Sequence, residues 1–412
     1  MGRPRIRRGY SLYPSQHNPW KVATICAISV VLVLVAGFLI LSSYKPLLAY
    51  LDSEPSESEA SSVVSRAPAV SAPSVSESVK LTPFSPTEPA QMRAAFMPVE
   101  AMSDENRAYT YLNGLAQAGY NTVVFECKDE NGRVCYQSRD AFVVQNELMN
   151  PGGVGNLPAL VETAHSFGLT AYASVYAFED HLAEKYSFEM AIYHVDQPNV
   201  FWLDDELENG GQSWLNPCST AAQDYICRIV DEVTLYGADG VLLEGAVFPT
   251  AYGSEYAGYG ADVDPDSHAD YLASFVNRCR LAARANDAVL CLSVSASGAL
   301  GVDTAAYGGA NPLRFGEDYA MVDLSLEKIE KIVSEDSTIE DPAADPAGSL
   351  SILSARLDEV NETGIVLLCR LQSYLARDDL DTEQFLQTQA DAAAQTGFGL
   401  YFYEPNGLYA EK

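Results

Sequence analysis

From about residue 90 to the end, the chain alternates short apolar runs with longer amphipathic stretches. Apolar runs of this kind are typical of buried parallel strands, and they occur at 94–99, 122–126, 170–175, 240–244, 288–294, 319–323, 364–369 and 398–403. Apolar residues at helical spacing predict helices between them, at 105–118, 157–167, 220–236, 268–285, 350–360 and 383–395. The regular alternation indicates an α/β fold with a parallel sheet.

The segment 214–249 is the most informative part of this pattern. Ser219 can cap a helix, and apolar residues follow it at helical spacing at Ile226, Ile229, Val230 and Val233. Gly237 ends the helix, and the next strand is apolar until Glu244 at its C-terminal end. A parallel β/α barrel keeps its catalytic groups at this end of its strands, so the segment predicts both a fold and a site.

Glycine turns of one kind end most of the predicted helices: QAGYN, SFGLT, LYGAD, ETGIV and QTGFG. Eight strands in roughly 320 residues predict a single (β/α)8 TIM barrel with loop insertions over residues 91–412. A doubly wound open sheet is the alternative. Its nucleotide-binding version is disfavoured because no GxGxxG motif follows the first strand.

An uncharged apolar run at 22–42 is long enough to cross a bilayer, which takes about 20 helical residues. Five basic residues precede it, Arg3, Arg5, Arg7, Arg8 and Lys21, and no acid occurs before Asp52. This bias predicts a single-pass signal anchor in the cell membrane, with the N-terminus in the cytoplasm and the C-terminal domain outside. A cleaved signal peptide is the alternative, although its apolar region is usually shorter.

The predicted organisation is a basic cytoplasmic tail at 1–21, a transmembrane anchor at 22–43, a linker at 44–90 and the barrel at 91–412. The linker is rich in Ser, Pro, Glu and Ala, which predicts a disordered spacer. The net charge of −31 argues against nucleic acid as a partner. We expect the barrel to be monomeric and to need no cofactor.

Seven of the eight cysteines lie in the predicted barrel, at scattered spacings and without a CxxC pair. Most are therefore expected to be small core residues. One disulfide, such as Cys127–Cys135, could still form in the oxidising environment outside the cell. No metal site is predicted. The acidic run at 262–266 lacks the glycine and the final acid that a calcium-binding EF-hand loop requires, since Ser267 and Ala273 stand there.

Several motifs in this order resemble the bacterial glycoside-hydrolase-like TIM-barrel domains of unknown function, over about residues 96–406. They are VVFECKDENGRVCY, ASVYAFEDHLA, WLNPCS, LLEGAVFP, LLCRLQSYL and GFGLYFYEPNG. The resemblance implies a TIM barrel that acts on carbohydrate. The chain departs from the family pattern beside the strand-end acid. Glu244 replaces an Asp, Gly245 a Tyr and Val247 an Arg.

Glycosidases usually place two carboxylates across the scissile bond, and one of them must stay protonated. The predicted catalytic residues are three strand-end acids, Glu244, Asp323 and Glu126. Glu244 is the candidate nucleophile or base because it matches the acid of the family. For the second acid, Asp323 is slightly preferred over Glu126. The structural alternative for Glu244 is a carboxylate that accepts hydrogen bonds from the loop backbone.

Sugar sites stack rings on aromatic side chains and bind hydroxyls with amides and charged groups. The predicted substrate-binding residues are Lys128, Asp129, Tyr176, Phe178, Trp214, Asn216, Arg370, Gln372 and Glu404. Structural roles are the alternatives, namely a local ion pair for Lys128, loop packing for Trp214 and a salt bridge for Arg370.

Two functions follow from the sequence. The first is a membrane-anchored, extracytoplasmic glycoside hydrolase that acts on a polysaccharide or cell-wall glycan. The second is a barrel without turnover that serves as a carbohydrate-binding or envelope scaffold protein. The altered residues beside Glu244 favour the second function, and the retained acid and loop motifs favour the first.

Overall fold

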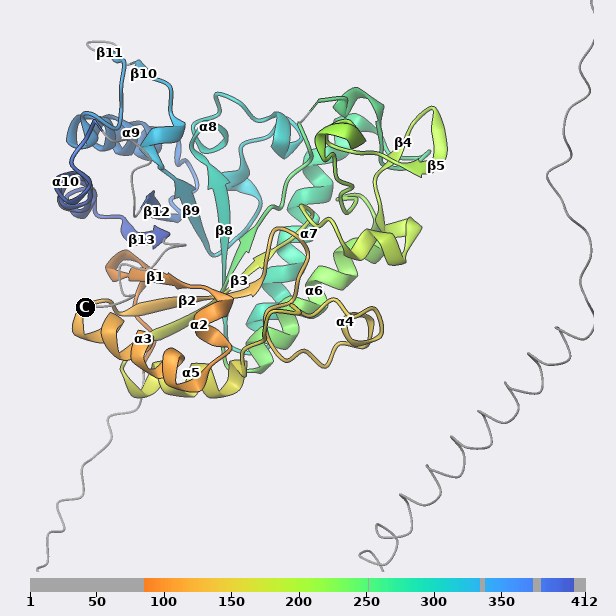
Figure 1. Ribbon diagram of the computed structural model, residues 1–412. Coiled ribbons are helices and arrows are strands. Elements are labelled where there is room, and N and C mark those ends of the chain that lie inside the picture. The colour runs from red at the N-terminus through yellow and green to blue at the C-terminus, as the bar shows by residue number, and fades with distance from the viewer. Residues whose placement is uncertain (1–84, 251, 334–337, 373–378, 404–412) are drawn as a thin grey trace, which may run out of the picture. The chain divides into compact units, whose positions relative to one another are not determined.

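Eight parallel strands form a closed barrel in the order β1-β13-β12-β9-β8-β6-β3-β2 (Figure 1). The computed structural model describes residues 85–250, 252–333, 338–372 and 379–403, which all belong to one compact unit, Lys80–Lys412. The first strand pairs in parallel with the last and so closes the sheet. The barrel that the sequence predicts is therefore present, and the open-sheet alternative is wrong.

The barrel strands are β1 (Arg93–Met97), β2 (Thr122–Lys128), β3 (Thr170–Tyr176), β6 (Gly240–Glu244), β8 (Val289–Ser295), β9 (Tyr319–Asp323), β12 (Val366–Gln372) and β13 (Gly399–Tyr403). Each corresponds to a predicted apolar run, and the bounds of β6 and β9 are the predicted ones. The largest difference is in β12, which extends three residues past the predicted end at Cys369. Arg370 and Gln372 therefore lie within a strand, at its C-terminal end.

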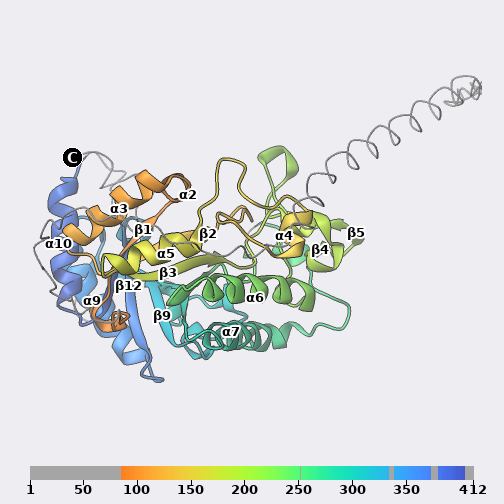
Figure 2. The same cartoon turned by 90° about the horizontal axis from the view of Figure 1, so that it is seen from below.

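Helices surround the barrel strands (Figures 1 and 2). The long ones are α3 (Glu105–Gln117), α5 (Leu157–Ser166), α6 (Thr220–Leu235), α7 (His268–Arg284), α9 (Pro346–Val360) and α10 (Thr382–Ala394). The short ones are α2 (Val99–Met102), α4 (Ala141–Gln145) and α8 (Ala296–Ala299). Helix α9 begins four residues before its predicted start because Asp345 caps it and Pro346 occupies its first position.

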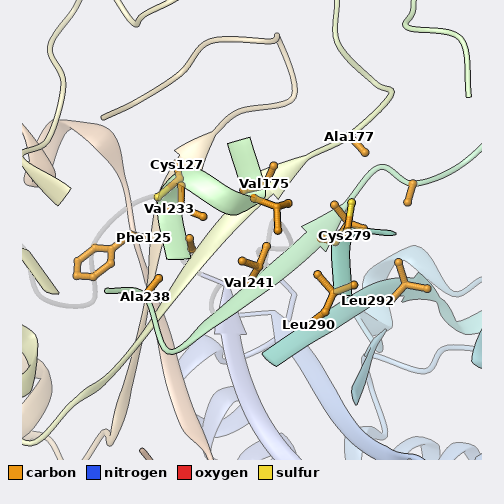
Figure 3. Packing of buried hydrophobic residues seen from close by; sticks show 14 of the residues in the cluster. Phe125, Cys127, Val175, Ala177, Val233, Ala238, Val241, Cys279, Leu290 and Leu292 are labelled. Carbon is orange, nitrogen blue, oxygen red and sulfur yellow. The ribbon is translucent and has the colours of Figure 1, made fainter. Parts of the chain in front are cut away.

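Two apolar cores hold the barrel. The inner core fills the barrel with inward-facing side chains such as Phe96, Tyr172, Leu242 and Met321. The outer core lies between the strands and the helices, and Figure 3 shows part of it, including Val241 of β6, Leu290 of β8 and Val233 of α6. Strand residues alternate between the two cores, so inward and outward positions can be assigned along every strand.

A long insertion follows β3. Its strands β5 (Gln197–Phe201) and β4 (Tyr193–His194) form a small sheet with β7 (Ala257–Gly258), which comes from the loop after β6. Ile192, Trp202 and Trp214 make a separate apolar cluster there. A second insertion forms the two-stranded sheet of β10 (Ile332–Val333) and β11 (Thr338–Ile339).

The predicted anchor and residues 44–84 of the predicted linker lie outside the described residues. The last residues of that linker, 85–90, contact the barrel, since Thr87 N donates to Thr170 Oγ1 at 2.7 Å, so the prediction of a disordered spacer is wrong for this end. Within the described ranges, no helix has the length and apolar character required to cross a membrane. The seven cysteines of the barrel unit are free thiols, so the bridge between Cys127 and Cys135 that the sequence allowed is not formed. Both of these cysteines are buried, as expected for core residues.

A bulge in β2 changes the direction of Lys128. Glu126 is the register partner of Ser174 and Lys128 that of Val175, so one extra residue reverses the alternation of the strand. Lys128 therefore points into the outer layer, where its Nζ lies 2.8 Å from Asp180 Oδ2 and donates to the carbonyl of Tyr176 at 2.8 Å. Both charged side chains are fully buried. The prediction that Lys128 binds substrate is corrected to a structural ion pair.

Replacing Lys128 by Met should destabilise the fold strongly. The substitution leaves the Asp180 carboxylate buried without its cation, and breaking a buried pair in this way costs about 3–5 kcal/mol. Chemical denaturation of the full chain measures the free energy of unfolding. The double variant Lys128→Met/Asp180→Asn removes both charges and should recover part of the loss. A single-variant loss below about 1 kcal/mol would contradict a stabilising role for this pair.

Candidate active site

Polar side chains occupy the inward-facing positions at the C-terminal ends of several strands. The alternation that points Leu242 into the barrel also points Glu244 inward, and the same holds for Asp323 after Met321 and Arg370 after Leu368. These residues come from β6, β9 and β12, and the closed sheet brings them to one rim. This rim is the mouth of the barrel.

Both carboxylate oxygens of Glu244 have bonding partners at the mouth. Its Oε2 lies 2.6 Å from Arg370 Nη1, and its Oε1 accepts a hydrogen bond from Ser174 Oγ at 2.7 Å. The Glu244 side chain is 3% exposed and that of Arg370 is 12% exposed. The ion pair joins residues 126 positions apart in sequence, from strands that are not neighbours in the barrel. The carboxylate is thus held in one orientation from two sides.

The backbone turns sharply directly after Glu244. Gly245 has a φ of +60°, in the left-handed region where residues with side chains are strained. A Cβ atom there would lie 3.2 Å from Tyr176 Cδ1 and 3.4 Å from Glu179 Cβ. The glycine that replaces the tyrosine of the family pattern therefore permits close packing of the next loop. Val247, which replaces the family arginine, is partly buried against the outer core.

Asp323 lies beside the same arginine. Its Oδ1 accepts hydrogen bonds from Ser325 N at 3.0 Å and Ser325 Oγ at 2.6 Å, and its Oδ2 lies 3.3 Å from Lys328 Nζ. Burial by itself would raise the pKa of Asp323. The charge of Arg370, the Ser325 hydrogen bonds and the charge of Lys328 outweigh burial and lower the pKa below its ordinary value. This environment keeps Asp323 ionised.

Glu126 has the opposite electrostatic environment. Burial raises its pKa to about 7, and the neighbouring carboxylates of Asp129, Glu100 and Glu130 raise it as well. The hydrogen bond that Glu126 Oε2 accepts from Val99 N at 2.8 Å acts in the other direction. At neutral pH a substantial fraction of Glu126 is therefore protonated.

A cavity of about 200 Å³ lies at the mouth. Its lining residues are Glu130, Tyr176, Ser325, Glu327, Lys328, Arg370 and Gln372. Three of the predicted substrate-binding residues, Tyr176, Arg370 and Gln372, therefore share one cavity. The side chain of Gln372 is held in place, since its Oε1 accepts from Glu327 N at 3.1 Å.

Other predicted substrate-binding residues have structural roles. Asp129 Oδ1 accepts from the backbone of Asn131 and Arg133, so this carboxylate stabilises a tight turn. Phe178 is fully buried and packs on Phe275, with ring centroids 4.5 Å apart. The prediction that Phe178 contacts substrate is wrong, since its side chain has no exposed surface, whereas contact of the partly buried Asp129 with substrate stays a prediction.

Trp214 and Asn216 stabilise the insertion after β3. Trp214 packs in the small cluster of the insertion and donates from Nε1 to Asp204 Oδ2 at 3.0 Å. Asn216 donates from Nδ2 to the carbonyl of Tyr259 at 2.9 Å and accepts from Cys218 N. Loop packing, the alternative for Trp214, is what the structure shows. The last predicted residue, Glu404, lies outside the described residues.

The sequence analysis missed several residues of the mouth. Ser174 orients Glu244, and its inward direction could have been predicted from the alternation of β3. Glu179 lies beside Gly245; burial raises its pKa, and the charges of Glu130 and Glu244 raise it further. Lys328 follows β9 in a loop, where no periodic pattern predicts its direction. Among the described residues, no group of three or more His, Cys, Asp or Glu side chains could hold a metal ion.

Comparisons with known proteins agree with this architecture. The solved glycoside hydrolase domain of PgaB (BpsB) from Bordetella bronchiseptica matches with a TM-score of 0.54 and 15% identity, over 76% of this chain and 94% of that one. A hypothetical protein from Ruminiclostridium thermocellum matches with a TM-score of 0.42 and 18% identity, over 48% and 96%. The glycoside hydrolase domain of PelA from Pseudomonas aeruginosa gives 0.41 and 15%, over 76% and 94%.

The match to the PgaB domain, at 15% identity, shows a common fold and nothing finer. No curated protein matches the chain. A family model described as "Putative glycosyl hydrolase domain" matches residues 94–308, which is just over half of the 412 residues. This match includes the strands that carry Glu126, Ser174 and Glu244. The chain therefore belongs to this family of glycosyl hydrolase domains.

Proposed function

We propose that the barrel hydrolyses glycosidic bonds in a polysaccharide or cell-wall glycan bound at its mouth. The observation that carries the proposal is the presence, at the mouth, of two carboxyl groups in different electrostatic environments. Glu244 is ion-paired with Arg370, and Glu126 is partly buried with a pKa raised to about 7. Ser174 connects them, because it is the register partner of Glu126 and donates to Glu244. Two-carboxylate hydrolysis needs one ionised and one protonated group.

Glu244 takes the role of nucleophile or base in this proposal. The guanidinium of Arg370 forms an ion pair with its carboxylate, and Ser174 fixes its orientation. Glu126 is the proton donor to the leaving oxygen. Asp323 is unsuited to that role because its neighbours lower its pKa, so it acts in holding Arg370 and Lys328. Tyr176, Arg370 and Gln372 supply the ring surface and the polar groups that contact the sugar.

Glu244→Gln should reduce hydrolysis by at least about a hundredfold, because the amide cannot act as nucleophile or base. A panel of polysaccharides is incubated with the full chain, and reducing ends are measured. Glu189→Gln, which alters an exposed carboxylate in the insertion, is the matched control and should keep full activity. Equal activity of wild type and Glu244→Gln on a substrate of the panel would exclude the proposed role.

The pH profile should show the titration of Glu126. A proton donor with a raised pKa is active below that pKa and loses activity above it. Hydrolysis should therefore fall about tenfold per pH unit above about pH 7. Glu126→Gln should lose activity on polysaccharide but keep it on an activated aryl glycoside of the same sugar, whose leaving group needs no proton. An unchanged alkaline limb in Glu126→Gln would assign the proton donor to another group.

A glycan-binding barrel without turnover is the second candidate function. One observation favours it, namely that both carboxylate oxygens of Glu244 are bonded and its side chain is 3% exposed. The polysaccharide panel separates the two candidates. A polysaccharide that the wild type binds without releasing reducing ends supports the second candidate, and release that depends on Glu244 supports the first.

We also propose that residues 22–43 anchor the domain in the cell membrane, with the barrel on the outer side. The apolar run and the basic residues before it support this proposal. Full-length protein should then fractionate with membranes, and protease added to intact cells should release the barrel by cleavage within residues 44–90. Recovery of a soluble protein trimmed at its N-terminus would instead identify a cleaved signal peptide.

A further inference from the structure

A second, larger cavity lies next to the mouth. It has a volume of about 590 Å³ and is bounded by α8, β10 and α9, and we call it the side groove. Ser325 and Lys328 line both the side groove and the mouth cavity, so the two share a wall. Asp323, at the end of β9, also lines the side groove. A chain-like ligand held at the mouth could therefore extend into the side groove.

The side groove is positively charged in an acidic protein. The chain has 25 Lys and Arg against 56 Asp and Glu. Even so, three cations line the groove, Lys328, Lys331 and Arg356. Among the described residues that line it, the one acid is Asp323, which is paired with Lys328 at 3.3 Å. Arg356 is positioned by its Nη1, which donates to the carbonyl of Val333 at 3.4 Å. The excess of positive charge favours an anionic ligand.

The floor and the edges of the side groove are apolar. Ile332 and Leu353 are buried at 3% exposure each, and Ile329 lies beside them. At the edges, Val302 is 68% exposed and Val333 is 52% exposed. Cavities of roughly 300–1,000 Å³ with apolar walls and a few charged groups are typical of small-ligand sites. Exposed aliphatic side chains at its edges favour an apolar group on the ligand.

We infer that the side groove binds an anionic sugar unit with an apolar substituent, next to the unit held at the mouth. Lys331 and Arg356 contact the anionic group, and Val302 and Ile332 contact the apolar one. This inference rests on the proposed function for the nature of the polymer, since a glycan at the mouth makes the neighbouring unit a sugar. It makes the substrate an acidic glycan with alkyl or acyl groups.

Binding of simple glycosides to the full-length protein in lipid nanodiscs tests the inference by calorimetry, with empty nanodiscs as the blank. Hexyl β-D-glucuronide has both the charge and the apolar group, hexyl β-D-glucoside lacks the charge, and glucuronate lacks the hexyl group. Hexyl glucuronide should bind at least about tenfold more tightly than either of the other two ligands. Relative to hexyl glucoside the gain corresponds to one charge-assisted contact, and relative to glucuronate to one small apolar contact.

Variants of the groove identify the site. Lys331→Gln should weaken binding of hexyl glucuronide about tenfold and leave hexyl glucoside unchanged. Val302→Asn should weaken both hexyl glycosides by a similar factor and leave glucuronate unchanged. The matched controls are Lys185→Gln and Val195→Asn, which alter exposed residues of the insertion after β3. Both controls should bind like the wild type.

The outcomes separate this inference from the proposed function. Equal binding of the glucuronide and the glucoside, or no effect of Lys331→Gln, would overturn the side groove as an anion site. If that happens while the wild type hydrolyses a polysaccharide, the proposed function survives alone. If Glu244→Gln and the wild type both bind hexyl glucuronide but neither hydrolyses any polysaccharide, the side groove stands and hydrolysis fails.

Discussion

Closure of the sheet by pairing β1 with β13 is the constraint on which the rest of the structure depends. Without it the eight strands would form an open sheet, and the ends of β6 and β12 would not face each other. Closure directs every second side chain of each strand into a common interior, and at the C-terminal ends these positions carry Glu244, Asp323 and Arg370. The ion pair between Glu244 and Arg370 is a direct result, because it spans the mouth between strands that do not touch.

The carboxyl groups at the mouth have different pKa values because their neighbours differ. Asp323 lies among cations and hydrogen-bond donors, which lower its pKa, whereas partial burial and neighbouring acids raise the pKa of Glu126. Two groups with similar ordinary pKa values thereby differ in protonation near neutral pH. In the proposed hydrolysis this difference favours Glu126 over Asp323 as the proton donor.

The departures from the family pattern also have a structural explanation. Gly245 allows a left-handed turn against Tyr176, which a side chain would obstruct. The arginine expected at position 247 is a partly buried valine, while Arg370 supplies a guanidinium to Glu244 from the opposite side of the mouth. The strand-end carboxylate thus keeps a cationic partner even though the local motif has lost its own.

The sequence by itself determined the elements and the rim of the barrel. Local apolar periodicity and helix caps are short-range signals, so all eight strands and six long helices could be predicted to within a few residues. The rule that strand ends share one rim correctly placed Glu126, Glu244, Asp323 and Arg370. Strand β12 was predicted too short because inward polar residues at a mouth interrupt the apolar run.

Only the tertiary structure decided which polar residues face the mouth. A one-residue bulge turned Lys128 away from the mouth into a buried ion pair, and no sequence pattern predicts where a strand bulges. Trp214 packs in a small apolar cluster whose residues come from segments that are far apart in the chain. The pairing of Arg370 with Glu244 likewise depends on the positions of two distant strands. Such contacts depend on strand register and on closure of the barrel, which relate distant segments of the chain to one another. The local hydrophobic pattern carries information only about the segment in which it occurs.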